Sequence, residues 1–151
     1  MRINTVVGLE DDEVVINCAE LTDEVRRIQR ILSEELEQSI IEGFSGETLF
    51  HIRPDEVLFF ETEGGAVFAH TVTGCYHIKL RLYELENTLP RNFIRISKSA
   101  ILNTRLICSV TGGISSSRLV RFSNCHKQVY ISRKYYGGFK KMMKGMVENE
   151  N

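Results

Sequence analysis

The chain has 151 residues and a mass of 17.3 kDa, which fits one domain or a small domain with an appendage. Hydrophobic residues make up 42% and charged residues 26%, and with 11 glycines and 2 prolines the chain is neither collagen-like nor disordered. The longest apolar runs have four residues, whereas a membrane helix needs roughly 20. The first residues form no signal-peptide pattern, so we expect a cytoplasmic protein.

Charge is distributed unevenly along the chain, although the net charge is only -1. Residues 1–45 hold 11 acidic and 4 basic side chains. Residues 87–147 hold 12 Lys or Arg and no Asp or Glu. A tract of this kind produces a positive field that favours a phosphate backbone or an anionic lipid. The simpler alternative is a chance run on a solvated surface.

The N-terminal part of the chain is predicted to form a strand followed by an amphipathic helix. A β-branched run at residues 14–18 predicts a short strand. Thr22 or Asp23 is expected to cap the helix, whose apolar side chains recur every three or four residues and form one stripe. This stripe can pack against its own domain, or it can dock a second protomer or a regulator.

From residue 47 onwards apolar and polar residues alternate, which predicts β-strands. Strands are expected at 48–52, 57–60, 66–73, 76–82, 93–96, 106–111, 118–122 and 128–131, and helices at 83–89 and about 134–147. The alternation in 76–82 would place Lys79 and Arg81 on one strand face. The predicted fold class is mainly β (α+β), with short helices at the edges.

We place the domain boundary at the glycine-rich segment 43–46. Residues 1–44 then form an acidic unit that serves regulation or dimerisation, and residues 45–148 form the second domain. Control of the protein is expected to enter through the acidic unit.

The chain carries no recognisable catalytic motif, so we expect no enzyme, no cofactor and no small-molecule substrate. The glycine pairs at 64–65 and 112–113 are explained better by hairpin turns than by phosphate-binding loops. The cysteines lie 57, 33 and 17 residues apart, which is unlike the spacing of a zinc site, and we expect reduced thiols and no metal. They are Cys18, Cys75, Cys108 and Cys125.

Three groups of cations are candidates for contact with nucleic acid. Lys79 and Arg81 could align with a phosphate backbone, or they could form an ordinary solvated face. Lys98 lies between two serines directly after a strand, where the backbone can approach a phosphate, with a plain capped turn as the alternative.

The third group lies at a predicted strand-to-helix junction, where Ser132 precedes Arg133 and Lys134. Two cations in the first turn of a helix oppose the helix dipole. An anionic partner at this end would relieve the conflict, and the alternative is a mildly unfavourable surface.

Several of these segments together resemble the motifs of a known family. Residues 93–103 carry the pattern F-x-R-x-x-[KR]-S-x-x-x-N, and some 30 residues later Ser132 and Arg133 precede a helix. Residues 47–147 strongly resemble the LytTR family of bacterial DNA-binding domains. The whole chain resembles stand-alone LytTR regulators, which lack a receiver domain.

The resemblance implies an elongated, mostly antiparallel β fold whose loops enter successive major grooves and bend the duplex. It implies that Arg133 reads a base edge and that Lys98 meets DNA from a central loop. Ser97 stands where many members have histidine, and Asn103 matches an asparagine that holds the fold. The remaining positions fall where members contact or face the phosphate backbone: Lys79, Arg81, Arg95 and Arg118.

We therefore interpret the chain as a transcriptional regulator that binds double-stranded DNA at short repeated elements. Its DNA-binding residues would include Lys134 beside Arg133, and we expect a homodimer. The resemblance further implies a small membrane protein as a regulatory partner. One alternative is a protein-interaction module that never touches DNA.

A second alternative is binding to anionic lipid through an amphipathic closing helix. Core packing is the simpler explanation of its apolar stripe. The residues concerned are Lys140, Lys141 and Lys144 with Phe139, Met142, Met143 and Met146.

Overall fold

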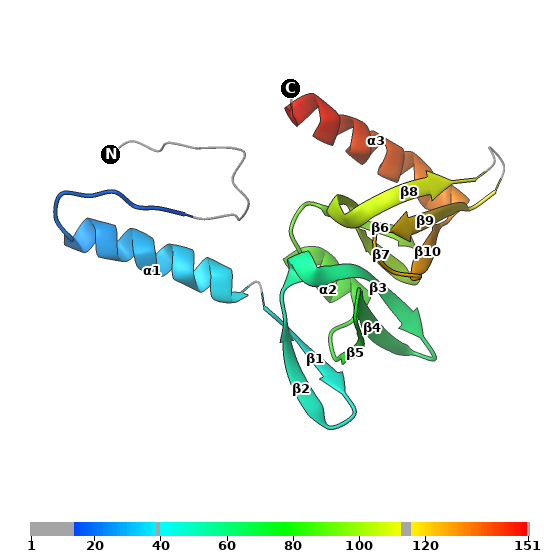
Figure 1. Ribbon diagram of the computed structural model, residues 1–151, viewed down its shortest axis with the longest axis horizontal. Helices are drawn as coiled ribbons and strands as arrows, with labels where there is room; N and C mark the ends of the chain where they lie inside the picture. Colours follow the sequence, from blue (N-terminus) through cyan, green and yellow to red (C-terminus); the bar gives the residue numbers. More distant parts are fainter. Residues whose placement is uncertain (1–13, 39, 113–115, 151) are drawn as a thin grey trace. The chain divides into compact units, whose positions relative to one another are not determined.

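The computed structural model describes residues 14–38, 40–112 and 116–150 (Figure 1). The chain divides into two compact units between Glu37 and Gln38, ahead of the division predicted after residue 44. No helix in the described part of the chain is long and apolar enough to cross a membrane.

The N-terminal unit is built around α1 (Asp23–Gln38), which begins where the sequence predicts. Thr22 caps it, because the Thr22 Oγ1 accepts a hydrogen bond from the Val25 backbone N–H at 3.3 Å. The strand predicted at residues 14–18 is wrong: these residues are exposed and form no strand. A β-branched run becomes a strand only where a neighbouring strand pairs with its backbone, and no described strand pairs with this one.

The second unit contains two antiparallel sheets, which confirms the predicted mainly β fold. The larger sheet has the order β2-β1-β5-β4-β3-β7-β6, and the smaller one has the order β10-β9-β8. The strands of the larger sheet are β1 (Ile41–Ser45), β2 (Thr48–Ile52), β3 (Val57–Glu63), β4 (Ala66–Thr71), β5 (Cys75–Ile78), β6 (Phe93–Ser97) and β7 (Ala100–Asn103). The remaining elements are β8 (Ile107–Thr111), β9 (Arg118–Phe122), β10 (Gln128–Ile131), α2 (Leu82–Thr88), α3 (Arg133–Glu150) and two short 3-10 helices, Pro54–Glu56 and Thr104–Leu106.

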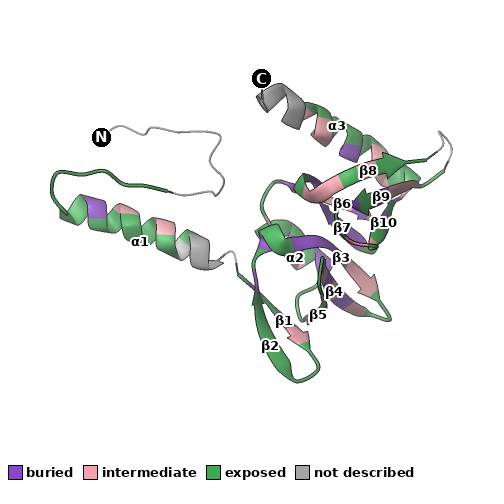
Figure 2. Cartoon of the chain, in the orientation of Figure 1, coloured by how far each residue is buried: buried purple, intermediate pink, exposed green. Residues whose placement is uncertain are grey.

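The first four residues of β3 are buried on both faces of the strand (Figure 2). Val57 and Phe60 pack into one core with α2, and Leu58 and Phe59 pack into a second core with the smaller sheet and α3. This explains why the sequence of β3 begins as an uninterrupted apolar run, a pattern of strands covered on both sides.

The sequence missed β1, because its central glycine was interpreted as a turn signal. A Cβ atom on Gly43 would lie 2.9 Å from the Cβ of Tyr76 and would collide with Ile52. Glycine is therefore needed for close packing inside the strand. Residues 41–44, which the sequence assigned to the acidic unit, belong to the sheet.

β5 is shorter than predicted, since it ends at Ile78. Leu80 is exposed, and Leu82 begins α2 as a buried helical residue. The alternation of apolar residues continued beyond the strand because the core also needs an apolar residue at the start of the helix.

The apolar side chains of α3 pack inside the protein. Phe139 is buried, and Met143, Tyr135 and Tyr136 pack against the same core. The core-packing interpretation of the Phe139 and Met143 stripe is confirmed, while Met146 lies outside the described side chains. The lipid-binding alternative loses support, because part of the apolar helix face that it requires is packed inside the protein.

Asn103 ties three segments of the second unit together, and it is 1% exposed. Its Oδ1 accepts hydrogen bonds from the Asn92 Nδ2 at 2.8 Å and from the Arg105 backbone N–H at 3.1 Å. Its Nδ2 donates to the Val57 carbonyl at 3.0 Å. The fold-forming role implied by the family resemblance is confirmed.

His70 lies where the two sheets meet. Its ring stacks on Phe59 at a centroid distance of 4.4 Å, and Phe59 stacks on Phe122 of the smaller sheet at 5.7 Å. Burial, with the nearby Lys127 cation as a smaller cause, lowers the pKa of His70 to about 4. The ring is therefore neutral near pH 7.

Replacing Asn103 with alanine should lower the free energy of unfolding by about 3 kcal/mol, because buried backbone and amide groups lose their partners. Urea denaturation followed by circular dichroism measures the change. Arg105→Ala, which alters an exposed side chain of the same turn, is the control. A loss for Asn103→Ala no larger than that of the control would contradict the role.

Acidification from pH 7 to pH 5 should destabilise the wild-type protein through His70. The unfolded state takes up a proton near pH 6.5, whereas the folded state resists protonation down to about pH 4. His70→Phe keeps a stacking ring and removes the titration, so its stability should fall less over this range. Equal pH slopes for the two proteins in denaturant titrations would refute the effect. Glu61, whose pKa is raised by burial and by Glu63, contributes with the opposite sign as the pH falls through its raised pKa.

Candidate functional site

The loop between β6 and β7 is a tight two-residue turn that presents Lys98. The Ser97 Oγ accepts a hydrogen bond from the Ser99 backbone N–H at 3.1 Å. The Ser99 carbonyl accepts another from the Thr62 backbone N–H of β3 at 2.7 Å. The backbone of the loop is therefore fixed, while the Lys98 side chain is exposed. The segment is a capped turn with an accessible cation, and its contact with a phosphate stays a prediction.

The junction between β10 and α3 lies directly beside this loop. The Ser132 backbone N–H donates to the Ile96 carbonyl of β6 at 2.8 Å. The Ser132 carbonyl accepts hydrogen bonds from Tyr135 and Tyr136 at 3.1 and 3.0 Å, which starts α3. The exposed cations of its first turn, Arg133 and Lys134, thus follow a backbone that is bonded to the strand carrying Ser97.

Arg118 lies at the same end of the smaller sheet. It pairs across the strands with Ile131, the last residue of β10. Its Nη1 donates to the Gly112 carbonyl at 2.7 Å, and its guanidinium carbon lies 4.3 Å from the centroid of the Tyr136 ring. Arg118 is half-buried and held in place, with its charge beside the start of α3.

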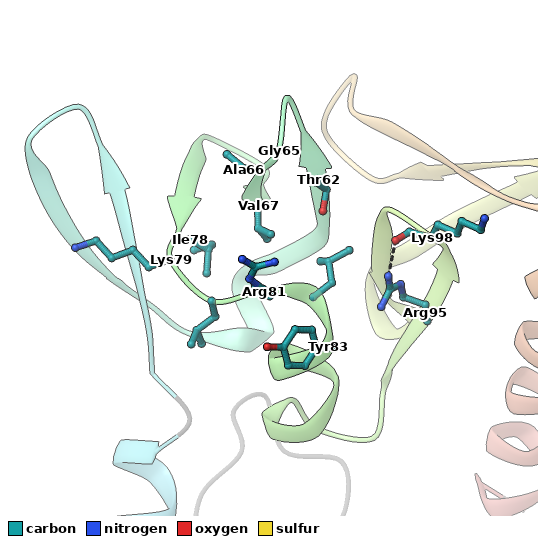
Figure 3. A pocket seen from close by; sticks show the side chains of 12 residues that line it. Thr62, Gly65, Ala66, Val67, Ile78, Lys79, Arg81, Tyr83, Arg95 and Lys98 are labelled. Carbon is teal, nitrogen blue, oxygen red and sulfur yellow. Dashed lines mark hydrogen bonds between the residues drawn. The ribbon is translucent and has the colours of Figure 1, made fainter.

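A second group of cations surrounds a hollow of about 420 Å³ in the larger sheet (Figure 3). Lys79, Arg81, Arg95 and Lys98 all line it. The figure shows Arg81 in the middle, with Lys79 pointing toward the β1–β2 hairpin and Lys98 pointing the opposite way. Lys98 therefore lies beside the cations at the start of α3 and also lines this hollow.

Lys79 and Arg81 do not share a strand face, which corrects the sequence prediction. Both lie in the connection after β5, because that strand ends at Ile78. The Lys79 Nζ lies 4.7 Å from the centroid of the Phe44 ring, a cation–π contact that the sequence could not reveal. The Arg81 backbone N–H donates to the Glu84 Oε1 at 3.4 Å and begins α2.

Arg95 differs from the other predicted phosphate contacts, because its guanidinium is engaged within the protein. Its Nε donates to the Ser97 carbonyl at 2.7 Å. Its Nη2 donates to the Lys98 carbonyl, and its Nη1 forms an ion pair with Glu86 of α2. The side chain is 25% exposed.

In the described part of the chain no three His, Cys, Asp or Glu side chains form a candidate metal site. The four cysteines are free thiols. What the arrangement offers chemically is a set of fixed loops and exposed cations, which suits an extended polyanion.

Comparison with known proteins gives concordant matches. Residues 47–144 match the family model of the LytTr DNA-binding domain. An uncharacterized HTH-type transcriptional regulator of Staphylococcus aureus (strain MSSA476) is 29% identical over 147 residues, covering 95% of this chain and 98% of the relative. A relative with the same kind of name from strain MRSA252 is 31% identical over 105 residues, covering 68% and 71%.

A solved structure shares the fold. The LytTr DNA-binding domain of a Bacillus cereus protein superposes with a TM-score of 0.65 at 23% identity. The match covers 70% of this chain and 96% of that domain.

Proposed function

The chain belongs to the LytTR family of DNA-binding domains, and from this premise we propose that it regulates transcription by recognising short repeated elements of double-stranded DNA through loops in successive major grooves. The observation that carries the proposal is the hydrogen bond between Ser132 and Ile96. It joins β6, the strand that leads into the Lys98 loop, to the junction that presents Arg133, so two cationic elements can meet one duplex together.

Arg133 is the proposed reader of bases. An arginine can donate two hydrogen bonds to the O6 and N7 atoms of guanine, which gives sequence preference. Its position in the first turn of α3 lets the helix end approach the groove, and DNA supplies the negative charge that this end lacks. Lys98 assists from the adjacent loop, and Ser97 holds that loop in shape.

Phosphate contacts are assigned to Lys79, Arg81, Arg118 and Lys134. Such contacts fix the register and orientation of a protein on the duplex without reading sequence. Lys79 and Arg81 lie in the connection after β5, Arg118 lies in β9 and Lys134 lies in α3.

The acidic N-terminal unit is the proposed point of control. It can dimerise the protein or take a signal from a partner, such as the small membrane protein implied by the family resemblance. Residues 1–37 carry 10 acidic and 4 basic side chains, so they can compete with DNA for the basic surface. Cytoplasmic location and homodimer formation stay predictions.

The proposal is tested by selecting bound sites from a pool of random duplexes and measuring affinity for the selected site by gel shift. Anionic liposomes serve as the competing anionic surface. Preference for one site over random duplex supports the proposal. Equal affinity for every duplex, or binding to liposomes alone, would overturn it.

Arg133→Ala should weaken binding to the selected site by about 1–3 kcal/mol and flatten the sequence preference. Lys79→Ala should instead weaken all duplexes alike and reduce the slope of log affinity against log salt by about one. Gel shifts over a salt series distinguish the two. Equal losses on selected and random duplexes for Arg133→Ala would remove its assignment as the base reader.

Deleting residues 1–37 should raise the affinity for random duplex, because the acidic competitor is removed. A deletion to residue 44 is unsuitable, since it would remove most of β1. Sedimentation of the same variant tests dimerisation. If neither affinity nor sedimentation changes, both proposed roles of the unit are discarded.

A further inference from the structure

We propose that Arg95 and Glu86 form a positioning pair that sets the shape of the Lys98 loop for base reading, and that Arg95 does not act as a phosphate contact. This inference rests on the proposed function and adds specificity-determining residues to it. It replaces the expectation, taken from family resemblance, that Arg95 faces the DNA backbone.

The geometry of the guanidinium group supports the reassignment. All three of its nitrogens donate to groups of the protein: Nε to Ser97, Nη2 to Lys98 and Nη1 to Glu86. The first two acceptors are the carbonyl of Ser97, the last residue of β6, and the carbonyl of Lys98 in the loop. Because arginine presents its donors in a rigid planar fork, these bonds fix the directions of both carbonyls at once.

The third acceptor connects the loop to the core. Glu86 lies on α2, whose Leu82 and Leu85 are buried in the core beneath the larger sheet. A charge-assisted ion pair between Arg95 and Glu86 therefore ties the loop to an anchored helix. The pair is partly shielded from water, since the two side chains are 25% and 40% exposed.

The presence of a carboxylate decides between the two roles. Glu86 is the last acidic side chain before the long tract that has none. A carboxylate beside a phosphate-binding arginine would repel DNA and compete for the same N–H groups. In a positioning role the same carboxylate is useful, because it holds the guanidinium in the orientation that the loop carbonyls require.

Without this pair the loop should keep its turn, but its backbone should be held less rigidly. Its other two hydrogen bonds, from Ser99 to the Ser97 Oγ and from Thr62 to Ser99, do not involve Arg95. Loosening the turn should matter most for base contacts, which depend on exact placement, and least for phosphate contacts. The signature is a loss of sequence preference with general DNA affinity retained.

Glu86→Gln tests the inference, because the two roles predict opposite signs. If Arg95 positions the loop, the variant should bind the selected duplex about fivefold more weakly than wild type, with unchanged or slightly higher affinity for random duplex. If Arg95 contacts phosphate, removal of the competing carboxylate should strengthen binding to both duplexes alike. The second result overturns the inference.

Arg95→Lys provides an independent test that keeps the positive charge. A single ammonium group cannot hold three acceptors in the same geometry, so the expected loss of preference is similar and the salt slope stays unchanged. The double variant should lose no more than either single variant, since both break one unit. Additive losses would contradict a positioning pair.

Matched controls are available at exposed positions outside the loop. Glu56→Gln repeats the charge change of Glu86→Gln, and Arg105→Lys repeats the exchange of a guanidinium for an ammonium group made in Arg95→Lys. Both should leave the ratio of selected to random affinity as in wild type. Thermal unfolding of each variant verifies that it is folded. A wild-type protein that prefers no duplex would defeat the proposed function itself, whereas a normal preference with strengthened binding in Glu86→Gln defeats only the present inference.

Discussion

The arrangement of the candidate site depends on one backbone hydrogen bond, from the Ser132 N–H to the Ile96 carbonyl. β6 is an edge strand of the larger sheet, and this bond covers part of its edge with the junction that starts α3. An edge strand offers unpaired backbone groups, which here receive a partner from the same chain. The consequence is that two segments more than 30 residues apart in sequence present their cations from adjoining backbones.

Local patterns were sufficient to predict much of the fold. β2, β9 and β10 have the predicted bounds, because turn signals lie close to both ends of these short segments. Residues 14–18 have strand composition but no partner among the strands that the structure describes, and β1 contains a glycine whose purpose is set by Tyr76 and Ile52 from elsewhere in the sheet. Both errors arise from tertiary contacts that a short sequence window does not contain.

The candidate site was predictable in its residues and less so in their arrangement. The carboxylate-free tract identified Lys98, and the alternation in residues 76–82 identified Lys79 and Arg81; the structure gathers all three around one hollow. The number of cations in the sequence could not show that Arg95 is hydrogen-bonded to the carbonyls of Ser97 and Lys98. The count could not show either that Arg118 lies over Tyr136, because this contact depends on how the chain folds. Counting charges thus predicts a cationic surface, but the different roles of its residues become visible only in the folded structure.

The double burial of β3 has a consequence for how the second unit unfolds. Val57 and Phe60 belong to one core, and Leu58 and Phe59 belong to the other, so a single strand is the common wall of both. Neither core can be exposed to solvent without also removing β3 from the other core. Melting of the two layers is therefore coupled into one cooperative event, with the backbone amides of this strand among the last to exchange with solvent.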